Sequence, residues 1–355
     1  MVIRTWSTSG REWVLDEVVG SGSEGVVYTV EHRPGLVAKL APLAAEPDVY
    51  RLRLESLVRQ GREPRTVKLL RGTPSRLAWP LETLVTSGGV IGYLMRDMRR
   101  AYLPFERLLL PTARRESLPE MTWGTALRTA ASLAILLADL HSEGYVVGDL
   151  KPDNLWANAE GRTGLADIDS LQFTDGRRAY PCRMRSPGYT APEGIDSDVL
   201  PDRSSDDFVL AVLVHQLLMG GLHPFHGRPA DGRPYFSLDD NVRNGRCRLT
   251  DPASVVLPKT APAADLLPRG LRNLFAQVFG RSGRADPASR PDAAAWARAL
   301  QTEARPGRLT VCARDERHVH TVERPWCPWC DQQEHGATTW GATGIRPGHS
   351  EVSRP

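Results

Sequence analysis

The chain has 355 residues, of which 41% are hydrophobic and 25% charged, which is typical of two modest domains or one two-lobed unit with a tail. Its net charge of +3 comes from acidic and basic residues in mixed order, so no basic surface for nucleic acid is predicted. The N-terminal segment contains no signal-like apolar run, and the most apolar segment, residues 208–221, is too short to cross a bilayer. We therefore expect a cytoplasmic protein with reduced cysteines and no membrane partner.

Residues 12–98 predict a small antiparallel sheet that carries one helix. Strand-like alternation runs through residues 12–40 around a glycine-rich turn, GSGSEG. The stretch DVYRLRLESLVRQG, residues 48–61, places apolar residues at helical spacing. From residue 77 to residue 98 the strand-like pattern returns, with SGG as a hairpin turn.

The following two hundred residues are predicted to be mainly helical. The segment WGTALRTAASLAILLADLHSEG is apolar nearly all round, as in a helix buried at the centre of a domain. Another buried helix is expected at 208–219, and amphipathic helices at 270–280 and 292–303. Residues 227–268 are rich in Pro, Gly and Arg and indicate mostly loop. The tail, residues 332–355, has too little apolar surface to fold and is predicted to be disordered.

The glycine-rich turn has the spacing of a phosphate-binding loop. It comprises Gly20, Ser21, Gly22, Ser23 and Gly25, with Val27 on the next strand. Glycine is needed where backbone must approach phosphate oxygens without an intervening Cβ. An ordinary hairpin turn is the alternative. Because the turn lies between two strands, the dinucleotide-binding version of this motif is disfavoured.

Lys39 ends the next strand among apolar neighbours, in LVAKL. Such a lysine either extends to the surface or is held inward by an anion. Glu55, on the predicted helix, is the expected carboxylate partner, and Glu46 and Glu63 are the alternatives.

The segment VVGDLKPDNL, residues 146–155, carries the residue types of a phosphotransfer loop. Asp149 can accept a hydroxyl proton, Lys151 can neutralise a transferred phosphoryl group, and Asn154 can offer a neutral oxygen to a metal. Asp167 follows a short strand and supplies the carboxylate that Mg²⁺ needs to bridge phosphates. Each residue alone could cap a turn. Their combination downstream of the glycine-rich turn and Lys39 predicts an ATP- and Mg²⁺-dependent site, with Mn²⁺ as an alternative metal.

In combination these motifs resemble a eukaryotic-type, bacterial Ser/Thr protein kinase domain over about residues 12–303. The resemblance implies an α+β bilobal fold with an N-lobe at 12–98 and a mainly helical C-lobe at 99–303. It also implies Met95 as the residue that gates the adenine pocket and Met98 as backbone donor and acceptor for adenine. A shift of this hinge assignment by one residue is the alternative. The implied catalytic residues are Asp149, Lys151, Lys39 and Glu55; the implied nucleotide-binding residues are Gly20, Ser21, Gly22, Ser23, Gly25, Val27, Lys39, Met95, Met98, Asn154 and Asp167, of which Asn154 and Asp167 hold the metal.

The resemblance continues past the catalytic segment, which separates protein kinases from kinases of small molecules. SPGYTAPE, residues 186–193, matches the end of an activation segment, with Ser186 expected near the catalytic aspartate. Arg290 is placed like the arginine that pairs with Glu193, and Asp206 like the aspartate that braces the catalytic loop. These matches favour a protein Ser/Thr kinase over a small-molecule phosphotransferase.

Four residues depart from the family pattern, namely Val147, Gly148, Ile168 and Asp169. They motivate the alternative of a pseudokinase that binds ATP as a scaffold or docking module in a signalling or stress-response complex. The Asp-x-Asp-Ser sequence resembles a bacterial subgroup whose kinases occur beside a PP2C-type phosphatase and a von Willebrand-type protein. Because no arginine precedes Asp149, the loop is non-RD, and we expect activity that does not require a phosphorylated activation loop.

The C-terminal segment CARDERHVHTVERPWCPWC predicts a structural zinc site in a knuckle at 308–331. Tetrahedral zinc needs four nitrogen or sulfur ligands, and the expected set is Cys312, His318, Cys327 and Cys330. His320 is the alternative to His318. A redox Cys-x-x-Cys is disfavoured because no thioredoxin-like context surrounds it.

Overall fold

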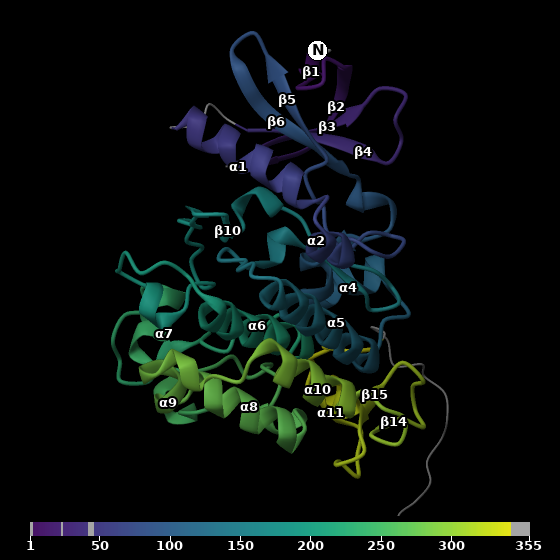
Figure 1. Cartoon of the computed structure of the whole chain (residues 1–355). Helices are drawn as coiled ribbons and strands as arrows, with labels where there is room; N and C mark the ends of the chain where they lie inside the picture. The colour runs from purple at the N-terminus through teal and green to yellow at the C-terminus, as the bar shows by residue number, and fades with distance from the viewer. Residues whose placement is uncertain (1–2, 23, 42–45, 342–355) are drawn as a thin grey trace, which may run out of the picture.

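The computed structural model describes residues 3–22, 24–41 and 46–341, and it places a strand-rich part beside a larger, mainly helical part (Figure 1). Six antiparallel strands follow the order β1-β2-β3-β4-β6-β5, and pairing of β1 with β5 closes them into a barrel. The strands are β1 (Ile3–Ser7), β2 (Glu12–Gly22), β3 (Gly25–Val30), β4 (Leu36–Leu40), β5 (Glu82–Thr86) and β6 (Gly89–Arg96). The sheet begins earlier than predicted, because β1 precedes residue 12, the expected start of the domain.

Strand alternation decides which side chains fill the barrel. Its interior is apolar and includes Trp13, Leu15, Leu84 and Leu94. Successive side chains of a strand point to opposite faces, so Ala38 of β4 enters this core while Lys39 faces the other way. The fold thereby directs Lys39 toward the helical part of the molecule.

Helix α1 (Pro47–Gln60) follows β4 and packs against β5 and β6. Proline suits the first turn of a helix because its missing N–H would have no intrahelical partner there. Leu54 and Leu57 are fully buried, which confirms the apolar stripe expected from the sequence. The helix also contacts the short 3₁₀ helix η3 (Ile168–Ser170) of the helical part. A short helix, α2 (Pro64–Leu69), comes next.

The helical part is organised around α5 (Trp123–Ser142), which packs against α6 (Arg203–Leu218) and α10 (Ala293–Glu303). Burial around almost the whole circumference of α5 explains its apolar sequence. The remaining helices of this part are α3 (Glu106–Leu109), α4 (Pro111–Ser117), α7 (Leu238–Asn244), α8 (Arg269–Phe279) and α9 (Arg281–Ala285). Its strands are β7 (Leu103–Pro104), β8 (Leu155–Ala157), β9 (Thr163–Leu165), β10 (Phe173–Asp175), β11 (Arg178–Tyr180), β12 (Arg228–Pro229) and β13 (Val255–Val256). Within the described ranges, none of the helices combines the length and the apolar character that a bilayer crossing requires.

The C-terminal segment packs onto the helical part instead of standing apart from it. It contains β14 (Leu309–Val311), β15 (Val319–Thr321) and α11 (Pro328–Glu334). Trp329 of α11 lies 6.2 Å from Trp123 of α5, measured between ring centroids.

The predicted disorder from residue 332 is wrong for residues 332–341. Helix α11 continues to Glu334, and Trp340 is only 1% exposed. The guanidinium carbon of Arg114 lies 3.6 Å from the centre of the Trp340 ring. One large aromatic side chain with a cationic partner therefore anchors a stretch that looks too polar to fold. The rest of the predicted tail, 342–355, lies outside the described residues.

Candidate active site

A cavity of about 330 Å³ lies between the barrel and the helical part. This volume is in the range of small-molecule sites. The predicted residues that line the cavity are Gly20, Ser21, Gly22, Gly25, Val27, Lys39, Met95, Met98, Lys151, Asn154 and Asp167. Ser23 lies outside the described residues. The fold thus brings together residues from the glycine-rich turn, from strands β3, β4 and β6, and from the loops around β8 and β9.

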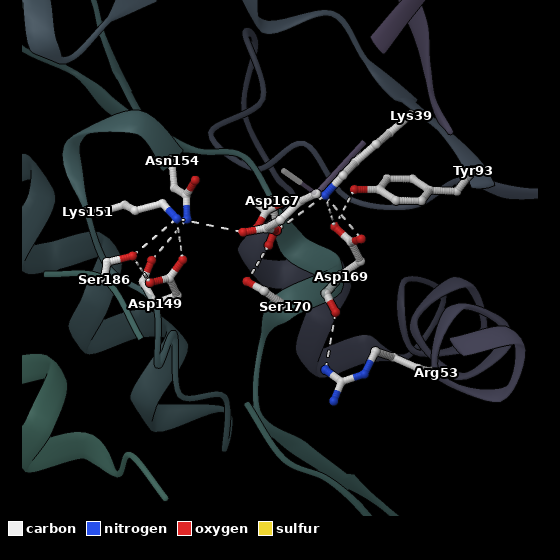
Figure 2. A network of polar contacts seen from close by, with 11 residues as sticks. Lys39, Arg53, Tyr93, Asp149, Lys151, Asn154, Asp167, Asp169, Ser170 and Ser186 are labelled. Carbon is white, nitrogen blue, oxygen red and sulfur yellow. Dashed lines mark hydrogen bonds and ion pairs between the residues drawn. The ribbon is translucent and has the colours of Figure 1, made fainter. Parts of the chain in front are cut away.

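Asp149 is 1% exposed and is held by neighbouring polar groups (Figure 2). Its Oδ1 accepts a hydrogen bond from Ser186 Oγ at 2.7 Å, and its Oδ2 accepts one from Lys151 Nζ at 2.6 Å. Asn154 Nδ2 donates to the backbone carbonyl of Asp149 at 2.9 Å. Ser186, which the resemblance placed near the catalytic aspartate, does contact it.

The loop before Asp149 is held by hydrogen bonds to Asp206, which lies in the first turn of α6. The amides of Val147 and Gly148 donate to its two carboxylate oxygens at 2.8 and 2.9 Å. His141 Nε2 lies 2.9 Å from Asp206 Oδ2. Because Asp206 is 2% exposed, these charge-assisted contacts form away from water, where they are strong. Val147, a departure from the family pattern, therefore still supports the loop through its backbone.

The backbone of Gly148 has a conformation that residues with a Cβ adopt only with strain. Its φ is +74°, and a Cβ built on it would lie 2.7 Å from Cys182 Cβ and 3.0 Å from Pro201 Cγ. Real Cβ atoms essentially never lie within 3.0 Å of another heavy atom, as this one would of Cys182. The structure therefore has no room for any side chain at the position where the family carries arginine.

Asp167 has the features of a metal ligand. Its φ is +58°, a left-handed conformation that Asp tolerates better than most residues. Its Oδ2 is buried and has no hydrogen-bond partner among the described residues. Burial, together with the neighbouring Glu24 carboxylate, raises the pKa of Asp167 to about 6. A buried carboxylate oxygen without a donor, beside the Asn154 amide, fits a hard cation such as Mg²⁺.

Lys39 is held by two aspartates that are separated by one residue in the chain (Figure 2). Its Nζ forms an ion pair with Asp167 Oδ1 and lies 2.9 Å from Asp169 Oδ1. Burial alone lowers the pKa of Lys39, but the charges of Asp169 and Asp167 outweigh it and raise that pKa. Glu24 of the glycine-rich turn adds a weaker contact, with Oε2 at 3.7 Å from Lys39 Nζ and Oε1 at 3.7 Å from Lys151 Nζ.

The prediction that Glu55 pairs with Lys39 is not what the structure has. Glu55 lies one turn from Arg51 on the same helix and accepts a hydrogen bond from its Nη1 at 3.1 Å. The carboxylates that pair with Lys39 are those of Asp167 and Asp169 instead. The sequence contained a signal for this contact, because a buried lysine needs an anion and Asp169 stands where the family has glycine.

The strand β6 and the residues after it form one wall of the cavity. Met95 pairs with Val37 of β4 and is 6% exposed. Met98 starts the 3₁₀ helix η1 (Met98–Arg100), and its carbonyl accepts hydrogen bonds from the amides of Ala101 and Tyr102. Met98 therefore does not fit the predicted role of backbone acceptor for adenine, because the local helical turn already uses that carbonyl.

Glu193 and Arg290 form the predicted ion pair. The two guanidinium nitrogens lie 2.8 and 2.7 Å from the two carboxylate oxygens, and the Arg290 side chain is fully buried. Arg290 also donates to the carbonyls of Gly283 and Ser204, at 2.7 and 2.9 Å. The end of the activation segment is thus tied to the turn before α10.

The C-terminal cysteines form a four-ligand cluster. The ligand atoms of Cys312, His318, Cys327 and Cys330 all lie within 4.8 Å of one another. The Cys312 and Cys330 sulfurs are 3.6 Å apart, close to the ~3.8 Å that Zn–S bonds of ~2.3 Å give in a tetrahedron. His320 Nδ1 lies 3.0 Å from the Thr321 carbonyl and is outside the cluster. The donor set therefore fits zinc, with His318 and not His320 as the fourth member.

The comparisons point to the same class as the motifs, because the relatives of this chain are named as protein kinases. No family model matches the chain. It is 29% identical over 352 residues to "Protein kinase YegI" of Escherichia coli, an alignment that covers 94% of this chain and 51% of that relative. It is also 29% identical over 234 residues to "Serine/threonine-protein kinase PkaB" of Streptomyces coelicolor, covering 61% of this chain and 51% of that protein. The mouse "cAMP-dependent protein kinase catalytic subunit PRKX" is 26% identical over 218 residues, covering 59% and 55%. The chain spans about half the length of these curated relatives.

Proposed function

We propose that this chain is an active protein kinase that transfers the γ-phosphoryl group of ATP to Ser or Thr hydroxyls of protein substrates. The observation that carries the proposal is the environment of Asp149. Its carboxylate is buried and is oriented by a hydroxyl and an ammonium group, and the Lys151 ammonium that contacts it lines the cavity of about 330 Å³. A base fixed in this way is suited to receive or orient an acceptor hydroxyl.

The neighbouring residues have complementary roles in this proposal. Asn154 and Asp167 would hold Mg²⁺, which supplies charge neutralisation at the phosphates of ATP. Lys39 would contact the α- and β-phosphates, and the glycine-rich turn would cover them with backbone amides. Lys151, 2.6 Å from Asp149, would place positive charge beside the transferred group. Most of the rate gain would come from positioning and electrostatics.

The two parts of the molecule would act as the lobes of the kinase, the barrel with α1 as N-lobe and the remainder to about residue 303 as C-lobe. The C-terminal knuckle would bind zinc with closed coordination, which suits scaffolding or docking and leaves no open catalytic position. A PP2C-type phosphatase and a von Willebrand-type protein are proposed as partners on the resemblance of the Asp-x-Asp-Ser motif.

The absence of an arginine before Asp149 would affect regulation more than chemistry. Gly148 offers no cation to a phosphorylated activation loop, while the backbone contacts to Asp206 hold the catalytic loop without one. We expect catalysis without prior phosphorylation of that loop.

The pseudokinase remains the second candidate, and a specific contact favours it. Lys39 Nζ and Lys151 Nζ each lie 3.7 Å from a carboxylate oxygen of Glu24. This carboxylate therefore already contacts two cations that the phosphates of ATP would need. In a pseudokinase this arrangement would persist with nucleotide bound. In an active kinase Glu24 would leave when the phosphates enter.

The deciding experiment measures transfer of labelled phosphate from ATP and Mg²⁺ to the protein itself and to a generic Ser/Thr substrate. Wild type should label, and Asp149→Asn, which keeps the shape but removes the base, should not. Asp198→Asn, a matched change at an exposed carboxylate, should behave as wild type. Binding of ATP by wild type without any transfer would favour the pseudokinase.

A further inference from the structure

Asp169 stands at a position where the kinase pattern has glycine, yet its side chain is only 9% exposed. A buried carboxylate is costly unless it is paired and hydrogen-bonded. The Asp169 carboxylate is both paired with a cation and hydrogen-bonded, and the identity of its partners indicates its role.

Both oxygens of Asp169 are engaged by protein donors. Oδ1 accepts from Lys39 Nζ at 2.9 Å and from the Tyr93 hydroxyl at 2.7 Å, and Oδ2 accepts from Lys39 Nζ at 3.1 Å (Figure 2). Asp167 differs, because its Oδ2 has no donor among the residues that the structure describes. The two aspartates therefore have different roles. Asp167 has one carboxylate oxygen that could bind a metal, whereas both carboxylate oxygens of Asp169 accept hydrogen bonds from Lys39 or Tyr93.

The backbone of Asp169 is held by helix α1. Arg53 Nη1 donates to the carbonyls of Asp169 and Leu171 at 3.2 and 2.8 Å, and its Nη2 donates to the carbonyl of Pro181 at 2.5 Å. Arg53 thus connects α1 to the segment that carries Asp169, while Glu55 on the same helix binds Arg51.

We propose that Asp169 is the positioning residue for Lys39, and that Arg53 links helix α1 to it. A movement of α1 would then change how Lys39 contacts the nucleotide, because Arg53 connects the helix to Asp169. No carboxylate of α1 itself would pair with Lys39. If Asp167 holds Mg²⁺, Asp169 would still orient Lys39. This inference rests on the proposed kinase function but has a test that does not need phosphoryl transfer.

That test is a crystal structure of the full chain with Mg²⁺ and a non-hydrolysable ATP analogue. The expected result is Lys39 Nζ within hydrogen-bond distance of Asp169 and of the phosphates, with Glu55 still on Arg51. A Lys39–Glu55 pair in that complex would overturn the inference, even if the enzyme is active. If the Lys39–Asp169 pair is present but wild type transfers nothing, the kinase proposal fails and the inference stands. A chain that binds no nucleotide with Mg²⁺ would contradict both.

Kinetics provide a readout that a purely structural role would not give. Asp169→Asn should lower kcat by about 10- to 100-fold, the range of one or two charge-assisted hydrogen bonds, with a much smaller change in KM for ATP. Tyr93→Phe keeps the carboxylate and should lower kcat only a few-fold, which provides a test if Asp169→Asn does not fold. Glu55→Gln, the variant that the usual pairing would predict to be damaging, should leave kcat near wild type.

A double-mutant cycle tests whether Asp169 acts through Lys39. In a Lys39→Met background, Asp169→Asn should have little additional effect on kcat, because the group that it positions is gone. Additive losses would mean that Asp169 acts by another route and would refute the inference. Arg53→Met should lower kcat in the same direction as Asp169→Asn, and an unchanged kcat would remove the proposed link to α1.

Discussion

Replacing Gly148 by alanine adds one methyl group at the most unusual position of the catalytic loop. Gly148 has φ of +74°, and adopting this region costs a residue with a Cβ about 1–2 kcal/mol. The added Cβ would also lie 2.7 and 2.9 Å from the Cβ and Sγ of Cys182, and such overpacking costs about 1–3 kcal/mol more. We therefore expect Gly148→Ala to lower the free energy of unfolding by about 2–5 kcal/mol.

Gly176 provides a matched control for this prediction. Its φ is +59°, but a Cβ there would meet no atom within 4 Å, so Gly176→Ala tests the backbone strain alone. Urea denaturation of both variants and wild type measures the difference. Gly148→Ala should be less stable than Gly176→Ala by about 1–3 kcal/mol, the packing contribution. Equal stability of the two variants would refute the argument that the structure excludes a side chain at residue 148.

Three other predictions concern stability, pH and metal binding. Arg290→Ala should lower the free energy of unfolding by about 3 kcal/mol, because Glu193 and two carbonyls lose their buried donor; a loss below ~1 kcal/mol in urea denaturation would contradict this. Burial lowers the pKa of His223 from 6.5 to about 4, so the unfolded chain binds its proton first as pH falls. The folded state should therefore lose up to about 3 kcal/mol between pH 6.5 and 4 through this group, and the pH dependence of Tm should be shallower in His223→Gln; an identical slope would be inconsistent with the buried neutral ring. His318→Gln should reduce the zinc content found by metal analysis, whereas His320→Gln should retain it, and the reverse pattern would show that the ligand assignment is wrong.

The parts of the site that are local in the chain could be predicted from the sequence. Asp149, Lys151 and Asn154 lie within six residues, and their spacing alone indicates a catalytic loop. The long helix α5 could also be predicted from the sequence, because a helix that is buried on all sides needs apolar residues on all sides.

Contacts between distant segments could not be read in this way. The ion pair between Lys39 and Asp169 joins residues 130 positions apart, and sequence spacing does not show which of several carboxylates the fold will bring to a lysine. The family pattern favoured Glu55, which instead pairs with its helical neighbour Arg51. In the same way, the anchoring of Trp340 depends on Arg114, a residue more than two hundred positions earlier in the chain.

The proposed kinase would transfer phosphate although no arginine precedes Asp149 in its catalytic loop. The most direct measurement is the initial rate of phosphate transfer to a Ser/Thr peptide by protein that a phosphatase has first stripped of all phosphate. Wild type should transfer phosphate without a lag, and Asp149→Asn should transfer none. Transfer that begins only after the protein has phosphorylated its own activation segment would contradict the proposed regulation, and ATP binding without any transfer would contradict the proposed activity.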